Sequence, residues 1–116
     1  MKIELWSSDL FDRDSTPSLE AGFSTIPEGL KALWDHVLGE GVQDDGRPTF
    51  TDFQLRLEGK RPISLPRDPH ANPALAALRR CRQTPLFLDE LVAVHAARLD
   101  RPFDFAPFLA LCPSAR

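Results

Sequence analysis

The sequence has two cysteines, no tyrosine and no long hydrophobic run. Cys81 and Cys112 are too few for a disulfide-stapled fold and are far apart in the chain, which favours a reducing compartment or an indifferent one. No apolar run approaches the roughly 18 residues that span a bilayer, and Glu4 interrupts the only candidate signal segment. We therefore expect a cytoplasmic protein without a membrane partner.

Several motifs that carry chemistry are also missing. Neither Gly-x-Gly-x-x-Gly nor Gly-x-x-x-x-Gly-Lys occurs, so the usual phosphate-binding loops are lacking. No Cys-x-x-Cys or His-x-x-x-His occurs, and the three histidines are dispersed. Asp12, Asp14 and Thr16 imitate the start of a calcium loop, but Pro17 stands where that loop needs glycine, and Phe23 where it needs glutamate. We expect neither a metal nor a cofactor.

The composition predicts one globular domain over residues 1–116. The chain is 42% hydrophobic and 27% charged, and at this size folding buries roughly two thirds of the unfolded surface. The net charge is −3, but residues 1–58 hold 12 acidic and 5 basic residues, giving −7, and the remainder holds 5 and 9, giving +4. This asymmetry predicts either separate acidic and basic surfaces or a neutral mosaic.

Hydrophobic periodicity indicates the elements of the first half. Residues 2–6 alternate as a strand with Trp6 on its polar face, and the polar residues 8–24 are predicted to form an ordered loop held to the core by apolar side chains, namely Phe11, Leu19 and Phe23. Thr25 and Glu28 form a capping-box pattern for a helix that Gly39 ends in the left-handed conformation. Its apolar stripe comprises Ile26, Leu30, Leu33, Trp34, Val37 and Leu38.

The second half predicts a hairpin and then helices. Residues 51–57 and 61–65 alternate as two strands, with Leu55 opposite Ile63 and Pro62 confining the second strand to an edge. Two helices follow, from Asn72-Pro73 to about Gln83 and from Thr84-Pro85 to about Asp100, and residues 104–112 form a short helix or a buried strand, of which we favour the helix. The expected fold is α+β, with a small antiparallel sheet of about three strands and three to four helices packed on one face.

One cluster near the middle of the second half offers two chemical alternatives. Arg79, Arg80 and Arg82 surround Cys81, and positive charge favours a reactive thiolate, but a small buried hydrophobe is the favoured interpretation. The same arginines suit phosphate contacts beside two consecutive helices, yet the turn between the helices lacks glycine and the protein is acidic, so we expect no nucleic-acid partner. His95 lies in an apolar stripe, as a hydrogen-bonded core histidine does. We therefore expect no enzyme.

The remaining interpretation is binding to another protein. Acidic loops speed association with a basic partner, and Trp6 is either an exposed aromatic anchor or buried under the 8–24 loop. We expect the partner-binding residues to converge into one negative surface and to comprise Trp6, Asp9, Asp12, Asp14, Asp44 and Asp45. By analogy of size and charge alone, the specific hypothesis is an inhibitor or immunity protein that covers the basic surface of a toxin or nuclease. An accessory subunit or adaptor is the alternative, followed by a thiol enzyme centred on Cys81 or a nucleic-acid binder that uses Arg79, Arg80 and Arg82.

Overall fold

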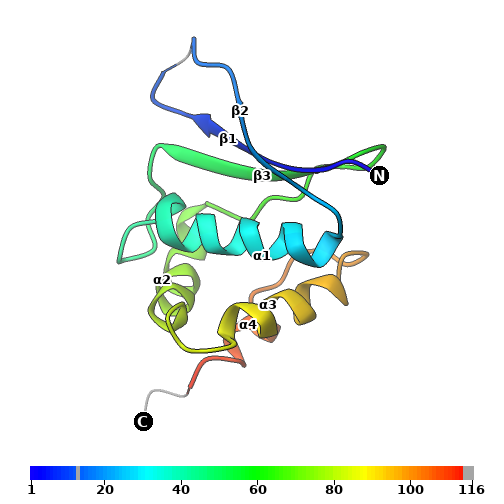
Figure 1. Cartoon of the computed structure of the whole chain (residues 1–116). Helices are drawn as coiled ribbons and strands as arrows, with labels where there is room; N and C mark the ends of the chain where they lie inside the picture. Colours follow the sequence, from blue (N-terminus) through cyan, green and yellow to red (C-terminus); the bar gives the residue numbers. More distant parts are fainter. Residues whose placement is uncertain (13, 114–116) are drawn as a thin grey trace.

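The computed structural model describes residues 1–12 and 14–113, and it places a three-stranded antiparallel sheet over a layer of helices (Figure 1). The strands are β1 (Ile3–Asp9), β2 (Ser18–Phe23) and β3 (Thr51–Leu57), in the order β2-β1-β3. The helices are α1 (Ile26–His36), α2 (Asn72–Cys81), α3 (Phe87–Ala96) and α4 (Ala106–Leu109). The predicted α+β class, a sheet of three antiparallel strands and the helices on one face of it are confirmed, although only two of the three predicted strands, β1 and β3, belong to the sheet.

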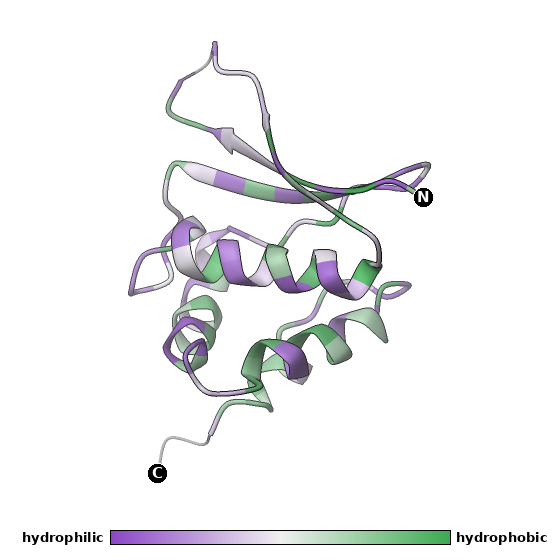
Figure 2. Cartoon of the chain, viewed as in Figure 1, coloured by the Kyte–Doolittle hydropathy of each residue, from purple (hydrophilic) through white to green (hydrophobic). Residues whose placement is uncertain are grey.

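The alternation of the strands decides which face of the sheet is covered. Ile3 and Leu5 of β1 are buried, as are Phe53, Leu55 and Leu57 of β3, while the residues between them remain partly exposed. Figure 2 shows the same alternation of hydrophilic and hydrophobic residues along β3. Because successive side chains of a strand point to opposite faces, one face packs on the helices and the other faces solvent.

Helix α1 begins as its sequence predicts and ends differently. The Glu28 backbone N–H donates to Thr25 Oγ1 at 3.3 Å, and the Thr25 hydroxyl donates to Glu28 Oε1 at 2.8 Å. The stripe of apolar residues is buried apart from half-buried Ile26. The prediction that Gly39 ends the helix in the left-handed conformation is wrong, because the chain continues through a π-helical turn, η1 (Val37–Gly41).

The prediction of a loop over residues 8–24 is wrong for β2. This strand pairs antiparallel with β1, with Ile3 opposite Phe23 and Leu5 opposite Ala21. It escaped the periodicity rule because most of its residues are exposed and the register shifts between Leu5 and Trp6, so no apolar alternation marks it. Phe23 packs against the core as expected, whereas Leu19 is exposed.

The predicted hairpin is half confirmed. Leu55 and Ile63 pair as expected, with backbone hydrogen bonds of 2.8 Å in both directions. That bridge is isolated, and residues 61–65 do not form a strand. Pro62 and Pro66 lack the backbone N–H that a longer ladder needs, which accounts for the difference.

Helix α2 begins at Asn72 as predicted, although Asn72 is not its cap, whereas α3 begins later than predicted. Asp68 caps a 3₁₀ turn, η2 (Pro69–Ala71), that leads into α2, and Asn72 lies inside the helix with its Oδ1 buried and unpartnered. Helix α3 begins at Phe87 rather than Thr84, after turns closed by backbone bonds from Thr84 and Phe87. The helical alternative for residues 104–112 is confirmed, since Asp104 Oδ1 accepts the Ala106 N–H at 3.0 Å before α4.

Leu86, which precedes α3, offers a simple test of backbone strain. Its φ is 68°, the left-handed region, and its side chain is 70% exposed. That conformation costs a non-glycine residue about 1–2 kcal/mol, more than the extra unfolded-state entropy of glycine, about 0.5–1 kcal/mol. We expect Leu86→Gly to raise the free energy of unfolding, measured in urea, by about 0.5 kcal/mol. An equal or lower value would show that the leucine side chain stabilises this turn.

Candidate functional site

Trp6 lies on the face of the sheet that the helices leave uncovered. It is half-buried, with the Arg56 guanidinium 4.4 Å from its ring centroid and its Nε1 donating to Glu4 Oε1 at 3.4 Å. Its neighbours across the strands are Leu19 of β2 and Gln54 of β3. Trp6 therefore contacts strand residues and a cation, and it presents a partly exposed aromatic edge on an open sheet face.

Three large apolar side chains are exposed where β1 ends and β3 begins. Phe11 is 76% exposed, Phe50 64% and Leu10 57%, and the two phenyl rings meet edge to face with centroids 5.2 Å apart. The prediction that Phe11 tacks this loop to the core is wrong, because Phe11 packs on an equally exposed ring. Because large exposed apolar patches are uncommon on monomeric proteins, this cluster is a candidate binding site.

The backbone that carries this cluster is ordered by hydrogen bonds. The Leu10 N–H donates to the Phe50 carbonyl at 2.7 Å, which continues the pairing of β1 with β3. Asp9 Oδ1 accepts the Phe11 N–H and Asp12 Oδ1 accepts the Asp14 N–H, both at 2.9 Å. We call Leu10, Phe11 and Phe50, together with the exposed Asp9, Asp12 and Asp14, the sheet-end surface.

Asp44 and Asp45 lie elsewhere, so the predicted single surface of five aspartates is wrong. They belong to the loop after η1, and this loop packs against α2 through Gly46. Arg79 Nε donates to Asp44 Oδ1 at 3.1 Å, and Arg47 Nε donates to Asp45 Oδ2 at 2.6 Å. Hydrogen bonds from the Arg47 backbone and side chain also lower the pKa of Asp45. Both carboxylates therefore have cationic partners within the fold.

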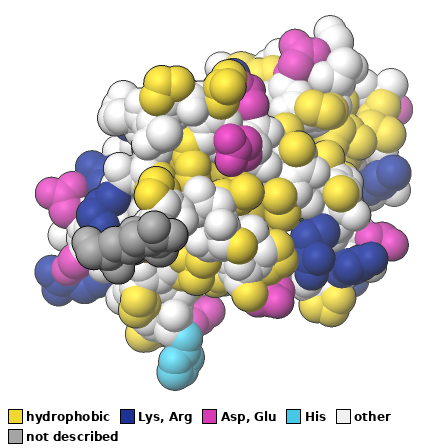
Figure 3. Space-filling model, turned by 90° about the horizontal axis from the view of Figure 1, so that it is seen from below, with side chains coloured by type: hydrophobic (Ala, Val, Ile, Leu, Met, Phe, Trp, Pro, Cys, Tyr) yellow, Lys and Arg dark blue, Asp and Glu magenta, His cyan; other side chains and the backbone are white. Residues whose placement is uncertain are grey.

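Part of the charge asymmetry along the sequence is folded into ion pairs between the two halves. Arg67, Arg79 and Arg82 of the second half pair with aspartates of the first half, which are Asp52, Asp44 and Asp35. Viewed from the helical side, acidic and basic side chains lie next to each other around a central hydrophobic area (Figure 3). The helical side is thus a mosaic rather than a surface of one sign.

The arginine cluster considered for nucleic acid has a structural role. The Arg79 guanidinium donates to the carbonyls of Leu38 and Gly39, where α1 passes into η1, and Arg82 Nε donates to Asp35 Oδ1 at 3.0 Å. Cations near the C-terminal end of a helix satisfy its free carbonyls. Two of the three arginines are thus committed to packing α2 on α1, which weakens the case for phosphate contacts.

The two cysteines lie close together despite their separation in sequence. Cys81 and Cys112 are both partly buried free thiols and line the same shallow groove between α2 and the segment after α4. Burial, and then the neighbouring Cys81, raise the pKa of Cys112 to about 11. A thiol with such a pKa is protonated near neutral pH and is a poor nucleophile. Cys81 packs against the core as the favoured interpretation expects.

His95 is the hydrogen-bonded core histidine that the apolar stripe indicates. It is 5% exposed and accepts a hydrogen bond at Nδ1 from Trp34 Nε1 at 3.0 Å. Phe103 and Phe108 meet its ring edge-on at 5.7 and 5.6 Å. Burial lowers the pKa of His95 to about 4, so its imidazole is neutral near pH 7.

Within residues 1–12 and 14–113, no three His, Cys, Asp or Glu side chains gather as metal ligands. In the same part of the chain, no helix combines the length and the apolar character needed to cross a membrane.

No protein-family model, curated protein or solved structure shows significant similarity to this chain. Function must therefore be inferred from the geometry and charge of the molecule itself.

The sequence indicated the acidic part of the sheet-end surface but not its apolar part. Asp12 and Asp14 lie outside the strands as predicted, whereas Asp9, predicted in the same loop, is the last residue of β1. Phe50 was not considered, and Phe11 was assigned to the core because apolar residues are usually buried. The available signal was local, since Leu10 and Phe11 stand between aspartates in a turn-like segment that offers little core to pack against.

Proposed function

We propose that this protein binds another protein through the sheet-end surface and thereby covers a basic surface of its partner, as an inhibitor or immunity protein of a toxin or nuclease would. The observation that carries the proposal is the exposed Phe11–Phe50 pair among three exposed aspartates. The proposal makes the chain a binding protein rather than an enzyme. We also propose that it acts in the cytoplasm, because its two free thiols are typical of a protein in a reducing compartment.

The apolar part of this surface supplies the anchor. Aromatic side chains that become desolvated at the centre of an interface often contribute most of its binding free energy. The Phe50 carbonyl accepts from the Leu10 N–H and the Phe11 N–H donates to Asp9 Oδ1, so the backbone that carries both rings is ordered before any partner arrives and less backbone entropy is lost on binding. A standard interface needs about 800 Å² from each protein, so we expect the open sheet face around Trp6 to extend the sheet-end surface in the complex.

The acidic part of this surface specifies the partner. Asp9, Asp12 and Asp14 flank the phenyl pair and carry exposed carboxylates. Charges at the rim of an interface accelerate association with an opposite charge and reject like charge. A nuclease presents a basic cleft to nucleic acid, and a surface with an apolar centre and acidic rim is complementary to such a cleft.

We expect the double variant Phe11→Ala/Phe50→Ala to weaken binding to a partner captured from the native host by about 100-fold or more, because hot-spot residues contribute about 2 kcal/mol or more each. The measurement is the Kd of the purified complex by calorimetry. Leu86→Ala is the apolar control, since Leu86 is equally exposed but lies before α3. Unchanged affinity in the double variant would overturn the proposal.

Charge is tested separately. The triple variant Asp9→Asn/Asp12→Asn/Asp14→Asn should slow association at low salt, while Asp44→Asn/Asp45→Asn should leave it unchanged, because those two carboxylates already have arginine partners. A partner whose own activity persists in the complex would favour the accessory-subunit or adaptor alternative over an inhibitor.

A further inference from the structure

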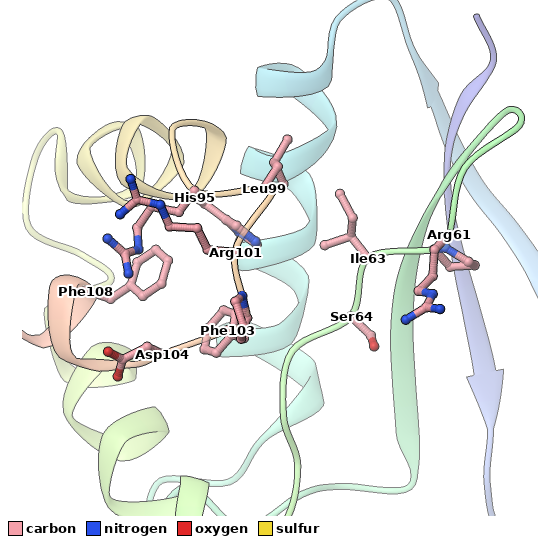
Figure 4. Close-up of a pocket in the computed structure, with 12 residues that line it drawn as sticks. Arg61, Ile63, Ser64, His95, Leu99, Arg101, Phe103, Asp104 and Phe108 are labelled. Atoms are coloured by element: carbon pink, nitrogen blue, oxygen red, sulfur yellow. The ribbon is translucent and has the colours of Figure 1, made fainter.

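A cavity of about 280 Å³ opens between the segment after β3 and the C-terminal end of α3. Figure 4 shows Arg61 and Ser64 on one side of it and Arg101, Phe103 and Asp104 on the other. It lies toward the end of β3 away from Phe50, so it is separate from the sheet-end surface and does not depend on the proposed function.

The arginines of this cavity differ from most others in the fold. Arg47, Arg67, Arg79 and Arg82 each pair with an aspartate. Among the described residues, Arg61, Arg98 and Arg101 form no ion pair, although all three line the same cavity. One acidic side chain, Asp104, lies in the lining with them, so the cavity is positively charged. Cations that line one cavity and have no ion-pair partner among the described residues favour an anion from outside.

His95 adds a fixed donor at the wall of the cavity. Its Nδ1 accepts the Trp34 N–H, and a neutral imidazole then carries its proton on Nε2. Nε2 has no hydrogen-bond partner among the described residues and is not fully enclosed, although the residue as a whole is 5% exposed. His95 lines the cavity, so this N–H is available to a bound oxygen atom.

The rest of the lining restricts the kind of anion. Phe103, Phe108 and Ile63 supply apolar surface, which a bare inorganic anion would not use. The volume is small compared with the usual range of about 300–1,000 Å³ for ligand sites, which excludes a nucleotide. We propose that this cavity binds a small organic acid, with its carboxylate held by Arg98, Arg101 and the His95 N–H and its apolar body against the phenylalanines.

The test uses benzoate, its uncharged analogue benzamide, and inorganic phosphate, each titrated into the whole protein and followed by amide NMR shifts. Benzoate should give saturable shifts at Ser64, Arg98 and Phe103. The affinity for benzamide should be lower than that for benzoate by at least about 10-fold. Phosphate should also bind more weakly, because it gains nothing from the apolar wall.

Variants locate the site independently of the probes. Arg98→Gln/Arg101→Gln should lower the affinity for benzoate by about 10-fold or more, because the charge-assisted hydrogen bonds from both arginines are removed. Arg80→Gln, outside the cavity, should leave that affinity unchanged. Any one of three results would overturn the proposal: no saturable shift in the wild-type protein, equal affinity for benzamide or phosphate, or unchanged affinity in the double variant. The probe comparison needs only the wild-type protein, so misfolding of a variant would not obscure it.

Discussion

Replacing Gly46 by alanine is expected to lower the free energy of unfolding by roughly 3 kcal/mol or more. Gly46 is buried with φ at +84°, and a Cβ there would lie 1.8 Å from the Asn72 carbonyl oxygen and 2.9 Å from the Ala76 nitrogen. Both atoms belong to the backbone of α2, so the clash cannot be relieved by the movement of a flexible side chain. The loop must therefore separate from the helix, and the Asp44–Arg79 pair should break with it. Urea unfolding measures the loss.

Gly59→Ala is the matched control. Gly59 has a similar φ of +73°, but nothing lies within 4 Å of an added Cβ. Its substitution costs only the left-handed strain of a non-glycine residue, about 1 kcal/mol. Equal losses for the two variants would show that backbone strain alone acts at Gly46 and that the contact of the loop with α2 contributes nothing.

The comparison of these two glycines also shows what the sequence reveals about the fold. Both occur in turn-like segments that sequence patterns identify, but the approach of one turn to α2 depends on tertiary packing. Helix α1 and strand β3 were found because their apolar periods report directly which face is buried. Strand β2 was missed because it buries little, and its pairing with β1 rests on backbone hydrogen bonds that leave no pattern in the side chains.

The same distinction explains the candidate site. Local sequence placed all five aspartates in loops, but it contains no information on which distant cation each one meets. Arg79 reaches Asp44 only because the 42–48 loop packs on α2, and Phe11 meets Phe50 only because β1 pairs with β3. Convergence of like charges is therefore a tertiary property, and a run of aspartates predicts a solvated loop more securely than a docking surface.

The second large effect is expected on the free energy of unfolding when the pH is lowered. Burial lowers the pKa of His95 to about 4 from 6.5, so the folded protein resists a proton that the unfolded chain accepts. The contribution of His95 to the free energy of unfolding is therefore fully present above pH 6.5 and is lost as the pH falls toward 4. We expect the free energy of unfolding to decrease from this cause by about 2 kcal/mol at pH 5 and by about 3 kcal/mol at pH 4. Denaturant titrations at successive pH values measure it.

His95→Gln separates this contribution from the protonation of carboxylates. Glutamine keeps an acceptor for the Trp34 N–H but does not titrate, so the variant should be less stable at pH 7 and should lose less stability between pH 6.5 and 5. His70→Asn removes an exposed imidazole outside the aromatic cluster and should retain the wild-type pH dependence. If His95→Gln followed the wild-type curve in parallel, the acid sensitivity would arise from other groups, and the buried imidazole would have no part in it.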